Sequence, residues 1–470
     1  MNARRAAWAA LFLAGAAFWV VLLDRAPGTL AGPPVALEDW PKEYRYLAVL
    51  QQAVREARVP YVLSEPIVFS RKFLAIPETC LSPQVALLLV LAPGAFVVVN
   101  TLLLHAAFCA GVVALARRLR LALVPAAAFY LLAGFNGHVT AHLAVGHSMW
   151  AGFLLLPLVL LPLVDLVEDA QAPRAPILLA GALAAILFQG ALHVFTWCVL
   201  LLLLVAAFRP GRLRPVAQAL AWTAGMTALR LLPAVFVARR RETAFLSGYP
   251  SLLDLLRGLA TVLPPEGAQR GGRFGVVSPW ELDAYVGPAG LALLVAGLVL
   301  FVRRAPGSVL ARLAGPIAVM AVLALGDAGV VLELSRLPLL SAERVTSRLV
   351  ALPLVIAALL AAVGLDRAWR AGGRGLRASI AIGVAATALG LAAHGWTWRV
   401  ASLAERLPER KGVVDVRIVD ADDISPEADR LYRRLVLAGA LVSLATGAAA
   451  VLRLRAPGQR RAAADSAIPS

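Results

Sequence analysis

The stretch "LSPQVALLLVLAPGAFVVVNTLLLHAAFCAGVVALARRLRL" (81–121) decides the fold class. Residues 94–116 are apolar over a length that crosses the hydrocarbon core of a bilayer as a helix. Three arginines, Arg117, Arg118 and Arg120, follow directly, as is typical of the cytoplasmic end of a span. The apolar residues before the Pro-Gly pair are too few for a span of their own, so they either dip into the bilayer or extend this one.

Apolar runs of this kind recur along the whole chain. Of its 470 residues, 60% are hydrophobic and 16% are charged, and the mean hydropathy is +0.78. One soluble core cannot bury so much apolar surface, so we predict an all-α, polytopic transmembrane helical bundle. We expect about twelve crossings, near residues 7–23, 94–116, 121–134, 148–167, 176–188, 191–208, 216–237, 286–302, 312–326, 348–365, 378–396 and 434–452.

The charge distribution supports a break at "FQGALH" (188–193), where residues 176–208 could otherwise form one long helix. With the break, loops on the side of the N-terminus carry 20 basic and 5 acidic residues, and loops on the other side carry 24 and 23. Together with Arg230 inside a span, these are all 45 basic and 28 acidic residues. The positive-inside rule then places both termini in the cytoplasm and the protein in the cytoplasmic (inner) membrane. The net charge of +17 is thus a topology signal, and nucleic acid is not expected as a partner.

This topology leaves one transmembrane domain over residues 1–453 and a basic cytoplasmic tail over 454–470. Three long segments lie outside the cytoplasm: 24–93, 238–285 and 397–433. The second contains a short apolar helix candidate, "PSLLDLLRGL" (250–259), and is suited to cover an outer cavity. In the first, residues 41–58 have the periodicity of a helix lying in the membrane interface, with an apolar face of Leu47, Leu50, Val54 and Ala57.

Two adjacent carboxylates, Glu38 and Asp39, stand just before that interfacial helix in "ALEDWPKEYRYL" (36–47). A carboxylate near substrate can accept a proton from an attacking hydroxyl or bind a divalent cation. Alternatively, Asp39 caps the helix, although Pro41 prefers the first helical position and would make Trp40 the cap. Lys42 also stands where a capping box has Glu or Gln. Both interpretations stay open.

Histidines cluster in "NGHVTAHLAVGH" (136–147), on the same predicted side. His138 and His142 would share a helical face, which permits a metal pair. No carboxylate nearby completes a ligand set, and His147 has no standard spacing. We therefore expect these histidines to contact an anion or a hydroxyl, and we predict no metal ligands.

Arginines facing outward are the third group of candidates. Arg241, Arg344 and Arg348 can bind a phosphate bidentately, although snorkelling beside anionic lipid explains each of them alone. Arg230 lies within a span, where an ionisable side chain faces either an aqueous cavity or a structural ion-pair partner. A second acidic patch in "PWELDAYVG" (279–287) holds Glu281, Asp283 and Tyr285 beside Trp280.

Several enzyme classes lack their motifs in this sequence. It contains no nucleotide-binding P-loop, no Gly-x-Ser-x-Gly elbow and no His-Glu-x-x-His helix. Few acidic residues lie in the spans, which argues against a proton-coupled transporter.

The order of several segments resembles that of YfhO-like polytopic membrane proteins, which belong with the GT-C superfamily of integral-membrane glycosyltransferases. The resemblance covers roughly residues 25–370. It rests on the opening stretch together with "ARVPYVLSEP" (57–66), "AAFYLLAGFNGHVTAHLAVGHSMWAGFLLLPLVLLPL" (127–163), "LRLLPAVFVARRRET" (229–243), "ELDAYVGPAGLALLVAGL" (281–298) and "LPLLSAERVTSRLVALPLVIAALLAAVGL" (337–365).

This resemblance implies a GT-C fold whose first outer loop carries interfacial helices and an essential acidic residue. It implies an enzyme that transfers a sugar, with inversion, from a polyprenyl-phosphate donor to a hydroxyl outside the cytoplasm. Asp39 is then the general base and Glu38 the neighbouring carboxylate. Residues that become candidates for binding the donor phosphate or the acceptor are His138, His142, Arg241 and Arg344.

We therefore predict a glycosyltransferase acting on an envelope polysaccharide, glycolipid or protein. Its expected partners are membrane lipid and the polyprenyl-phosphate-linked donor. No organic cofactor is expected, and a divalent cation is the one cofactor left open. The alternative is a non-enzymatic transporter of lipid-linked envelope precursors, or an envelope-assembly component. A transporter needs openings on both sides of the membrane, whereas the enzyme needs one outward cavity containing Asp39.

Overall fold

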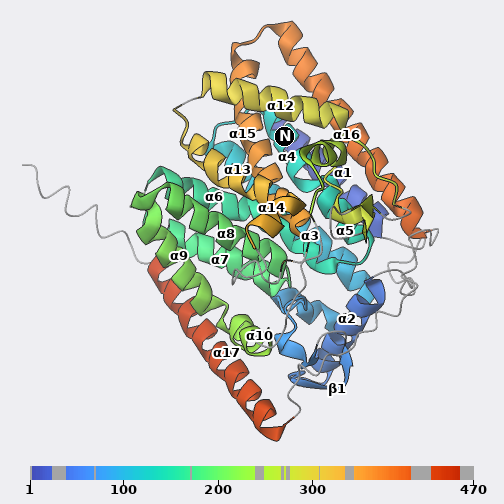
Figure 1. Cartoon of the computed structure of the whole chain (residues 1–470), viewed down its shortest axis with the longest axis vertical. Helices are drawn as coiled ribbons and strands as arrows, with labels where there is room; N and C mark the ends of the chain where they lie inside the picture. Colours follow the sequence, from blue (N-terminus) through green and yellow to red (C-terminus); the bar gives the residue numbers. More distant parts are fainter. Residues whose placement is uncertain are drawn as a thin grey trace, which may run out of the picture.

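Helices make up most of the computed structural model, which describes residues 3–23, 39–67, 70–169, 172–238, 248–265, 269–270, 276–305, 307–333, 343, 345–403 and 425–455 (Figure 1). Two short antiparallel hairpins accompany them in that part of the chain. They pair β1 (Val62–Ile67) with β2 (Ser70–Lys72), and β3 (Gln269–Arg270) with β4 (Val276–Val277).

The helices follow the order expected from the apolar runs. They are α1 (Ala3–Leu23), α2 (Trp40–Arg55), α3 (Pro93–Arg118), α4 (Leu123–Gly134), α5 (Gly137–Ala144), α6 (Leu156–Glu168), α7 (Ala175–Phe188), α8 (Leu192–Phe208), α9 (Leu213–Met226), α10 (Ala228–Ala238), α11 (Leu252–Ala260), α12 (Gly287–Arg304), α13 (Ala314–Leu323), α14 (Gly326–Val331), α15 (Ala351–Ala371), α16 (Arg374–Leu403) and α17 (Pro426–Arg455). Short 3₁₀ turns connect several of them, among them η1 (Phe73–Ala75), η2 (Pro83–Leu89), η3 (Ser148–Leu155), η6 (Pro279–Glu281) and η9 (Thr346–Val350).

The predicted all-α polytopic bundle is confirmed, but the count of about twelve crossings is not. Among the described residues, seven helices are long and apolar enough to span a membrane. An eighth span arises if α9 and α10, which are bent by 81° relative to each other, are counted as one. The seven are Ala3–Leu23, Pro93–Arg118, Ser148–Glu168, Gly287–Arg304, Thr346–Ala371, Arg374–Ser402 and Pro426–Arg455.

Four short helices explain the difference between twelve and eight. The expected spans over 121–134, 176–188, 191–208 and 312–326 correspond to α4, α7, α8 and α13, with 12, 14, 17 and 10 residues. At a rise of 1.5 Å per residue, helices of this length cover about 15–25 Å of a hydrocarbon core roughly 30 Å thick. The break at residues 188–193 does exist, because α7 ends at Phe188, α8 begins at Leu192, and Gly190 between them has φ +83°.

Residues that charge parity assigns to one side of the membrane contact one another in the structure. Arg118 pairs with Asp165 and Glu168, and Arg370 pairs with Asp366. Arg312 donates a hydrogen bond to the Val167 carbonyl, and Arg4 to that of Leu121. Apart from Arg370 and Asp366, which are four residues apart, these partners lie far apart in sequence. The basic helix ends therefore gather at one end of the bundle, as predicted.

The centre of the bundle is α15, which packs between α4, α12 and α13. It crosses α12 closely at Gly297 and Gly364, where a Cβ on Gly364 would lie 2.0 Å from the Gly297 carbonyl oxygen. Small residues permit such close backbone approach between membrane helices. The long helices α16 and α17 run along opposite outer edges, α16 beside α1 and α12, and α17 beside α9 and α10 (Figure 1).

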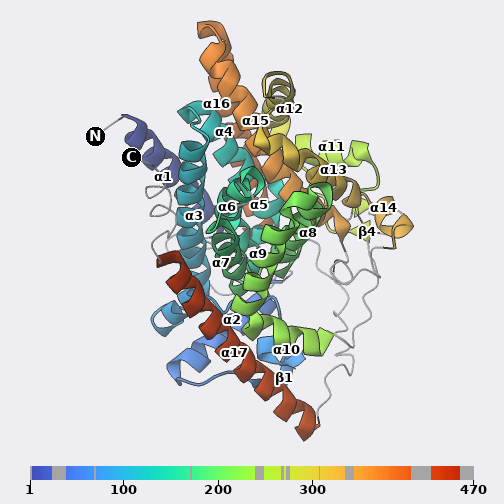
Figure 2. The ribbon, with the colours of Figure 1, turned by 90° about the vertical axis from the view of Figure 1, so that its left-hand side faces the viewer.

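The predicted interfacial helix in the first outer segment is present as α2, at the same end of the molecule as β1 and α10 (Figure 2). Its buried apolar face differs from the prediction, because Ala57 lies beyond the helix end in a turn with φ +49°. The turn η2 over Pro83–Leu89 is separate from α3 and does not extend it. The Gln51 amide of α2 donates hydrogen bonds to the carbonyls of Leu88 and Leu91. The apolar face consists of Tyr46, Leu47, Leu50 and Ala53.

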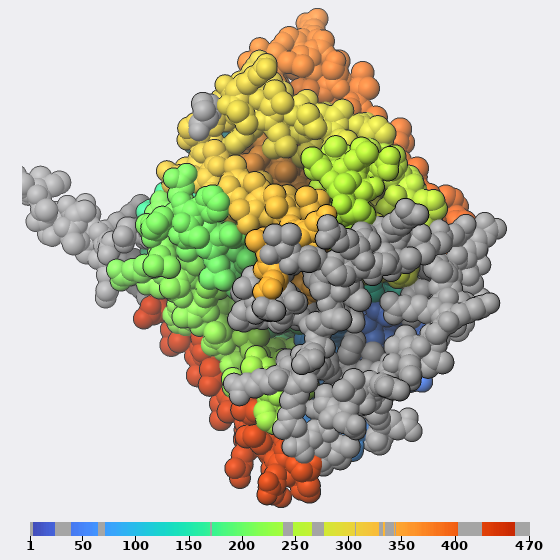
Figure 3. Space-filling model, viewed as in Figure 1, coloured from blue at the N-terminus to red at the C-terminus, as the bar shows by residue number. Residues whose placement is uncertain are grey.

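The short apolar helix predicted over residues 250–259 is α11, which packs beside α12 (yellow-green and yellow in Figure 3). Ser251 caps it by accepting a hydrogen bond from the Asp254 amide. Its outer face exposes Leu252, Leu253 and Leu256. This distribution is typical of an amphipathic helix.

Candidate functional site

A buried lysine in the first turn of α2 gathers three carboxylates around it. Lys42 Nζ lies 2.8 Å from Asp39 Oδ2, 3.0 Å from Glu78 Oε2 and 3.8 Å from Glu43 Oε1. Asp39 is three residues before Lys42, which places both on one helical face. Glu78 comes from the turn that follows η1. With all three carboxylates ionised, this cluster would carry two uncompensated negative charges in a mostly buried place.

Burial and neighbouring charges decide which of these groups are ionised. Burial alone would raise the pKa of Asp39, but His147 and Lys42 outweigh it and hold that pKa well below its usual range. Burial would lower the pKa of Lys42, yet Glu78, Asp39 and Glu43 raise it. For Glu43, burial raises the pKa to about 8, although Lys42 opposes the rise. At neutral pH, Asp39 is therefore an ionised carboxylate and Glu43 is mainly a neutral acid.

Asp39 occupies the N-cap position of α2, but its side chain does not cap the helix. The expectation that Trp40 is the cap is wrong, because Trp40 is the first helical residue and its indole donates a hydrogen bond to the Ala144 carbonyl. Asp39 instead accepts a hydrogen bond from Lys42 and lies 2.9 Å from His147 Nε2. Its side chain keeps 27% of its surface exposed. Two basic side chains thus hold an accessible carboxylate in a fixed position.

The predicted histidines lie together behind Asp39. His138 and His142 are one turn apart on α5, with ring centroids 4.6 Å apart, and His147 follows the end of that helix. The Nδ1 atoms of His142 and His147 lie 2.6 Å apart. Burial lowers the pKa of His138 to about 3 and that of His142 well below its usual range. Both α5 histidines are therefore neutral and buried in the wall of the site.

Arg348 is one of the predicted arginines, and it reaches this wall from η9. It forms a bidentate ion pair with Glu281, with Nε to Oε2 at 2.7 Å and Nη2 to Oε1 at 2.5 Å. Its guanidinium lies 5.7 Å over the Trp150 ring. Burial would raise the pKa of Glu281, but Arg348 holds it below the usual value. Glu281 Oε2 lies 3.8 Å from His142 Nε2, so this pair continues the polar network from Asp39.

A further buried carboxylate, Glu343, closes the network on the side of α8. It accepts a hydrogen bond from Trp197 Nε1 at 2.9 Å and lies 3.0 Å from His193 Nδ1. Trp197 stacks on Trp150 with 5.3 Å between ring centroids. Because Glu343 and both indoles are buried, this part of the network supports the wall of the site from inside.

Arg230 does not join the other candidates, and it makes neither of the contacts predicted for it. Its guanidinium is buried and donates hydrogen bonds to the turn that precedes the site: to the carbonyls of Ile76 (3.1 Å), Pro77 (2.7 Å) and Thr79 (2.9 Å), and to Thr79 Oγ1 (3.1 Å). Glu78 lies within this turn. Arg230 therefore fixes the backbone that carries Glu78.

The second acidic patch divides between two places. Glu281 joins the network, whereas Asp283 is buried against α16. There Asp283 Oδ2 lies 2.8 Å from both His394 Nε2 and Trp398 Nε1. The Tyr285 ring stacks on His394. Asp283 thus anchors the segment that carries Glu281.

Three of the predicted site residues lie outside the described part of the chain: Glu38, Arg241 and Arg344. Sequence reasoning also missed residues that the structure brings into the network. Lys42 and Glu43 could have been recognised from their positions three and four residues after Asp39 on an amphipathic helix. No sequence signal indicated Glu78, His193 or Glu343, which come from separate segments.

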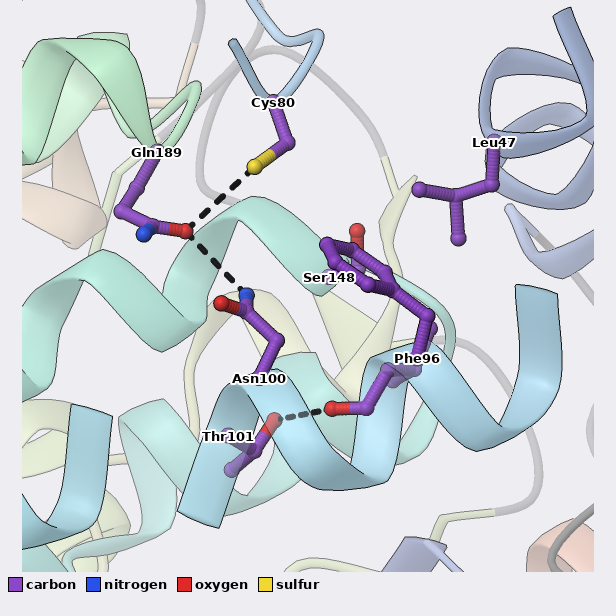
Figure 4. Close-up of a pocket in the computed structure, with 8 residues that line it drawn as sticks. Leu47, Cys80, Phe96, Asn100, Thr101, Ser148 and Gln189 are labelled. Atoms are coloured by element: carbon purple, nitrogen blue, oxygen red, sulfur yellow. Dashed lines mark hydrogen bonds between the residues drawn. The ribbon is translucent and has the colours of Figure 1, made fainter. Parts of the chain in front are cut away.

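A small pocket adjoins the cluster beneath α2 (Figure 4). Gln189 Oε1 accepts hydrogen bonds from the Asn100 amide and the Cys80 thiol on one wall. Ser148 lines the pocket and donates a hydrogen bond to Glu43. The polar lining of this pocket is uncharged, in contrast with the network around Lys42.

Within the described ranges, no group of three or more His, Cys, Asp or Glu side chains is arranged to hold a metal ion. The carboxylates there are instead close to Lys42, Arg348 and histidines. Whether the protein needs a divalent cation is a question for experiment.

Comparisons with known proteins bear on the fold. No protein family model and no curated protein matches the sequence. Among solved structures, the chain is similar to the arabinofuranosyltransferase AftD from mycobacteria, with a TM-score of 0.50 and 20% sequence identity. The match covers 85% of this chain but only 27% of that chain. At this identity the likeness supports the predicted GT-C-like membrane bundle as a fold, and the resemblance to YfhO-like proteins stays a prediction.

Proposed function

We propose that this chain is an inverting membrane glycosyltransferase that moves a sugar from a polyprenyl-phosphate donor to a hydroxyl acceptor outside the cytoplasm. The observation that carries the proposal is Asp39. It is an ionised carboxylate, partly exposed, and held by His147 and Lys42. The fold likeness to a membrane arabinofuranosyltransferase supports the same reaction class.

In the proposed reaction, the acceptor hydroxyl gives its proton to Asp39. The acceptor oxygen then bonds to the anomeric carbon while the bond from that carbon to the phosphate oxygen breaks, and the phosphate leaves with the electron pair. Attack from the side opposite the phosphate inverts the anomeric centre. Arg348, with part of its side chain exposed, supplies positive charge near the leaving phosphate. Arg241 and Arg344 are proposed to contribute further positive charge.

The exposure of Asp39 suits a reaction with an acceptor hydroxyl. Its side chain is 27% exposed, whereas Glu343, Trp150 and Trp197 are buried behind it and support the wall of the site. Glu38, next to Asp39 in sequence, is proposed as the neighbouring carboxylate. The lipid part of the donor would lie in the membrane beside the bundle. A transporter of lipid-linked precursors, the alternative, needs no ionised base at this position.

The test compares envelope glycans and glycolipids in cells that produce wild-type protein, Asp39→Asn, Glu38→Gln or the control Glu56→Gln at matched levels. Glu56 is an exposed carboxylate immediately after α2, paired with Arg58, so its loss should not affect transfer. We expect Asp39→Asn to abolish the product and Glu56→Gln to leave it unchanged. Normal product in Asp39→Asn cells would refute the base assignment.

A further inference from the structure

A chain of two histidines connects Asp39 to the interior of the protein. His147 Nε2 lies 2.9 Å from Asp39 Oδ2, and His147 Nδ1 lies 2.6 Å from His142 Nδ1. Both nitrogens of His147 are thereby engaged, one by a carboxylate and one by another imidazole. His142 itself is fully buried and has no exposed surface for substrate.

The local backbone brings the two rings together. Helix α5 ends at Ala144, and Gly146 takes φ +97°, which turns the chain back so that His147 stacks on His142 with 4.9 Å between centroids. A Cβ at Gly146 would lie 2.5 Å from the Trp40 amide nitrogen. On its other sides, His142 packs against the rings of His138 and Trp150 at 4.6 and 4.7 Å. The position of His142 is therefore fixed by packing.

The geometry requires a proton on His147 Nε2, because the ionised Asp39 carboxylate 2.9 Å away can only accept a hydrogen bond. One further proton lies between the Nδ1 atoms of His142 and His147, which are 2.6 Å apart. Whichever ring carries that proton, this contact fixes the orientation of the His147 ring and keeps its Nε2–H directed at Asp39.

The other ring nitrogen of His142 faces a second carboxylate. His142 Nε2 is buried and makes no hydrogen bond within the described residues, and Glu281 Oε2 lies 3.8 Å away. The other charged or titratable groups near Asp39 and these rings are Lys42 and Glu43 on α2, Glu78 after η1, His138 on α5, His193 on α8 and Arg348 on η9.

We infer that His142 is a positioning residue that holds the His147 ring with its Nε2–H directed at Asp39, and so controls the protonation of the proposed base. This inference rests on the proposed function, because it assigns His142 a role in the same site. A similar third member, remote from substrate, orients the histidine of hydrolase triads. His142 would thus act through His147 and never contact the sugar.

Two substitutions of His142 separate this role from simple packing. In His142→Asn, the side-chain amide lies near the original Nδ1 and can still donate to His147, whereas in His142→Gln it lies near the original Nε2 and cannot. We expect His142→Gln to lower kcat by about tenfold or more with little change in KM, and His142→Asn to recover most of the loss. The acid limb of the pH profile should move to higher pH in the Gln variant, because Asp39 loses a donor that stabilises its ionised form.

An infrared titration tests the same point without activity. The protonated carboxyl band that Asp39→Asn removes should appear at higher pH in His142→Gln than in wild type or His142→Asn. Equal behaviour of the Asn and Gln variants in both measurements would overturn the inference. If wild type transfers no sugar but the infrared shift is seen, the proposed function fails while the role of His142 stands.

Discussion

Arg230 provides the sharpest stability prediction, because a buried guanidinium here binds backbone carbonyls and not a carboxylate. Replacing it by methionine keeps the apolar stem and removes every donor. The Ile76 carbonyl retains hydrogen bonds from the Thr79 amide and hydroxyl, and the bond to the Leu74 carbonyl is long at 3.4 Å. The main losses therefore fall on the carbonyls of Pro77 and Thr79. A buried acceptor left unpaired costs about 1–3 kcal/mol, so two cost roughly 4 kcal/mol.

Part of that cost is offset because the variant no longer desolvates a charge, so we expect Arg230→Met to lower the free energy of unfolding by about 3 kcal/mol. The measurement is denaturant unfolding in detergent micelles, followed by circular dichroism. Arg118→Met is the matched control, since it removes an exposed arginine from ion pairs with Asp165 and Glu168 and should cost under about 1 kcal/mol. Equal losses of unfolding free energy in the two variants would refute the claim that Arg230 fixes the turn containing Glu78.

Three further perturbations test other parts of the site. Because the pKa of Glu43 is raised to about 8 in the folded protein, its contribution to stability is present at low pH and is lost as pH rises from its ordinary pKa through 8. Glu43→Gln should therefore flatten the pH dependence of the unfolding midpoint between about pH 5 and pH 9, and an unchanged slope would contradict this. Gly190→Ala forces a side chain onto φ +83° and places its Cβ 2.3 Å from the Glu78 carbonyl oxygen. It should lower the free energy of unfolding by about 1–3 kcal/mol in the same assay. An unchanged free energy would mean that the α7–α8 turn is not constrained. EDTA should change the rate of sugar transfer by no more than about twofold, because Lys42 and Arg348 already neutralise carboxylates of the site. A larger loss that Mg²⁺ or Mn²⁺ restores would show that a cation is needed.

Long apolar runs and charge asymmetry were sufficient to predict the membrane bundle and the segregation of its two ends. They could not determine the number of crossings, since α4 and α7 are apolar throughout but too short to span alone. Hydropathy records the apolar length of a segment and not whether protein or lipid surrounds it. The bend between α9 and α10 also has no strong signal in the sequence.

The candidate site was predictable where its residues share a local element. Asp39 and the histidines of α5 came from short motifs, and the structure places them in one network. Glu78 and Glu343 enter it only through tertiary contacts, with Lys42 and with Trp197, that local periodicity does not encode. The position of Arg230 shows the converse, because a charged residue in an apolar helix serves the backbone of a distant turn and not a ligand.

Transfer by purified protein tests the central claim most directly. Three proteins would be reconstituted in liposomes: wild type, Asp39→Asn and Glu56→Gln. The liposomes would contain polyprenyl-phosphate-linked sugars and envelope glycans extracted from producing cells. Mass spectrometry would follow the loss of sugar from the lipid. The proposal predicts that wild type and Glu56→Gln move sugar from lipid to acceptor and release polyprenyl phosphate, while Asp39→Asn does neither. Undiminished transfer by Asp39→Asn, or none by wild type with any extracted donor, would contradict it.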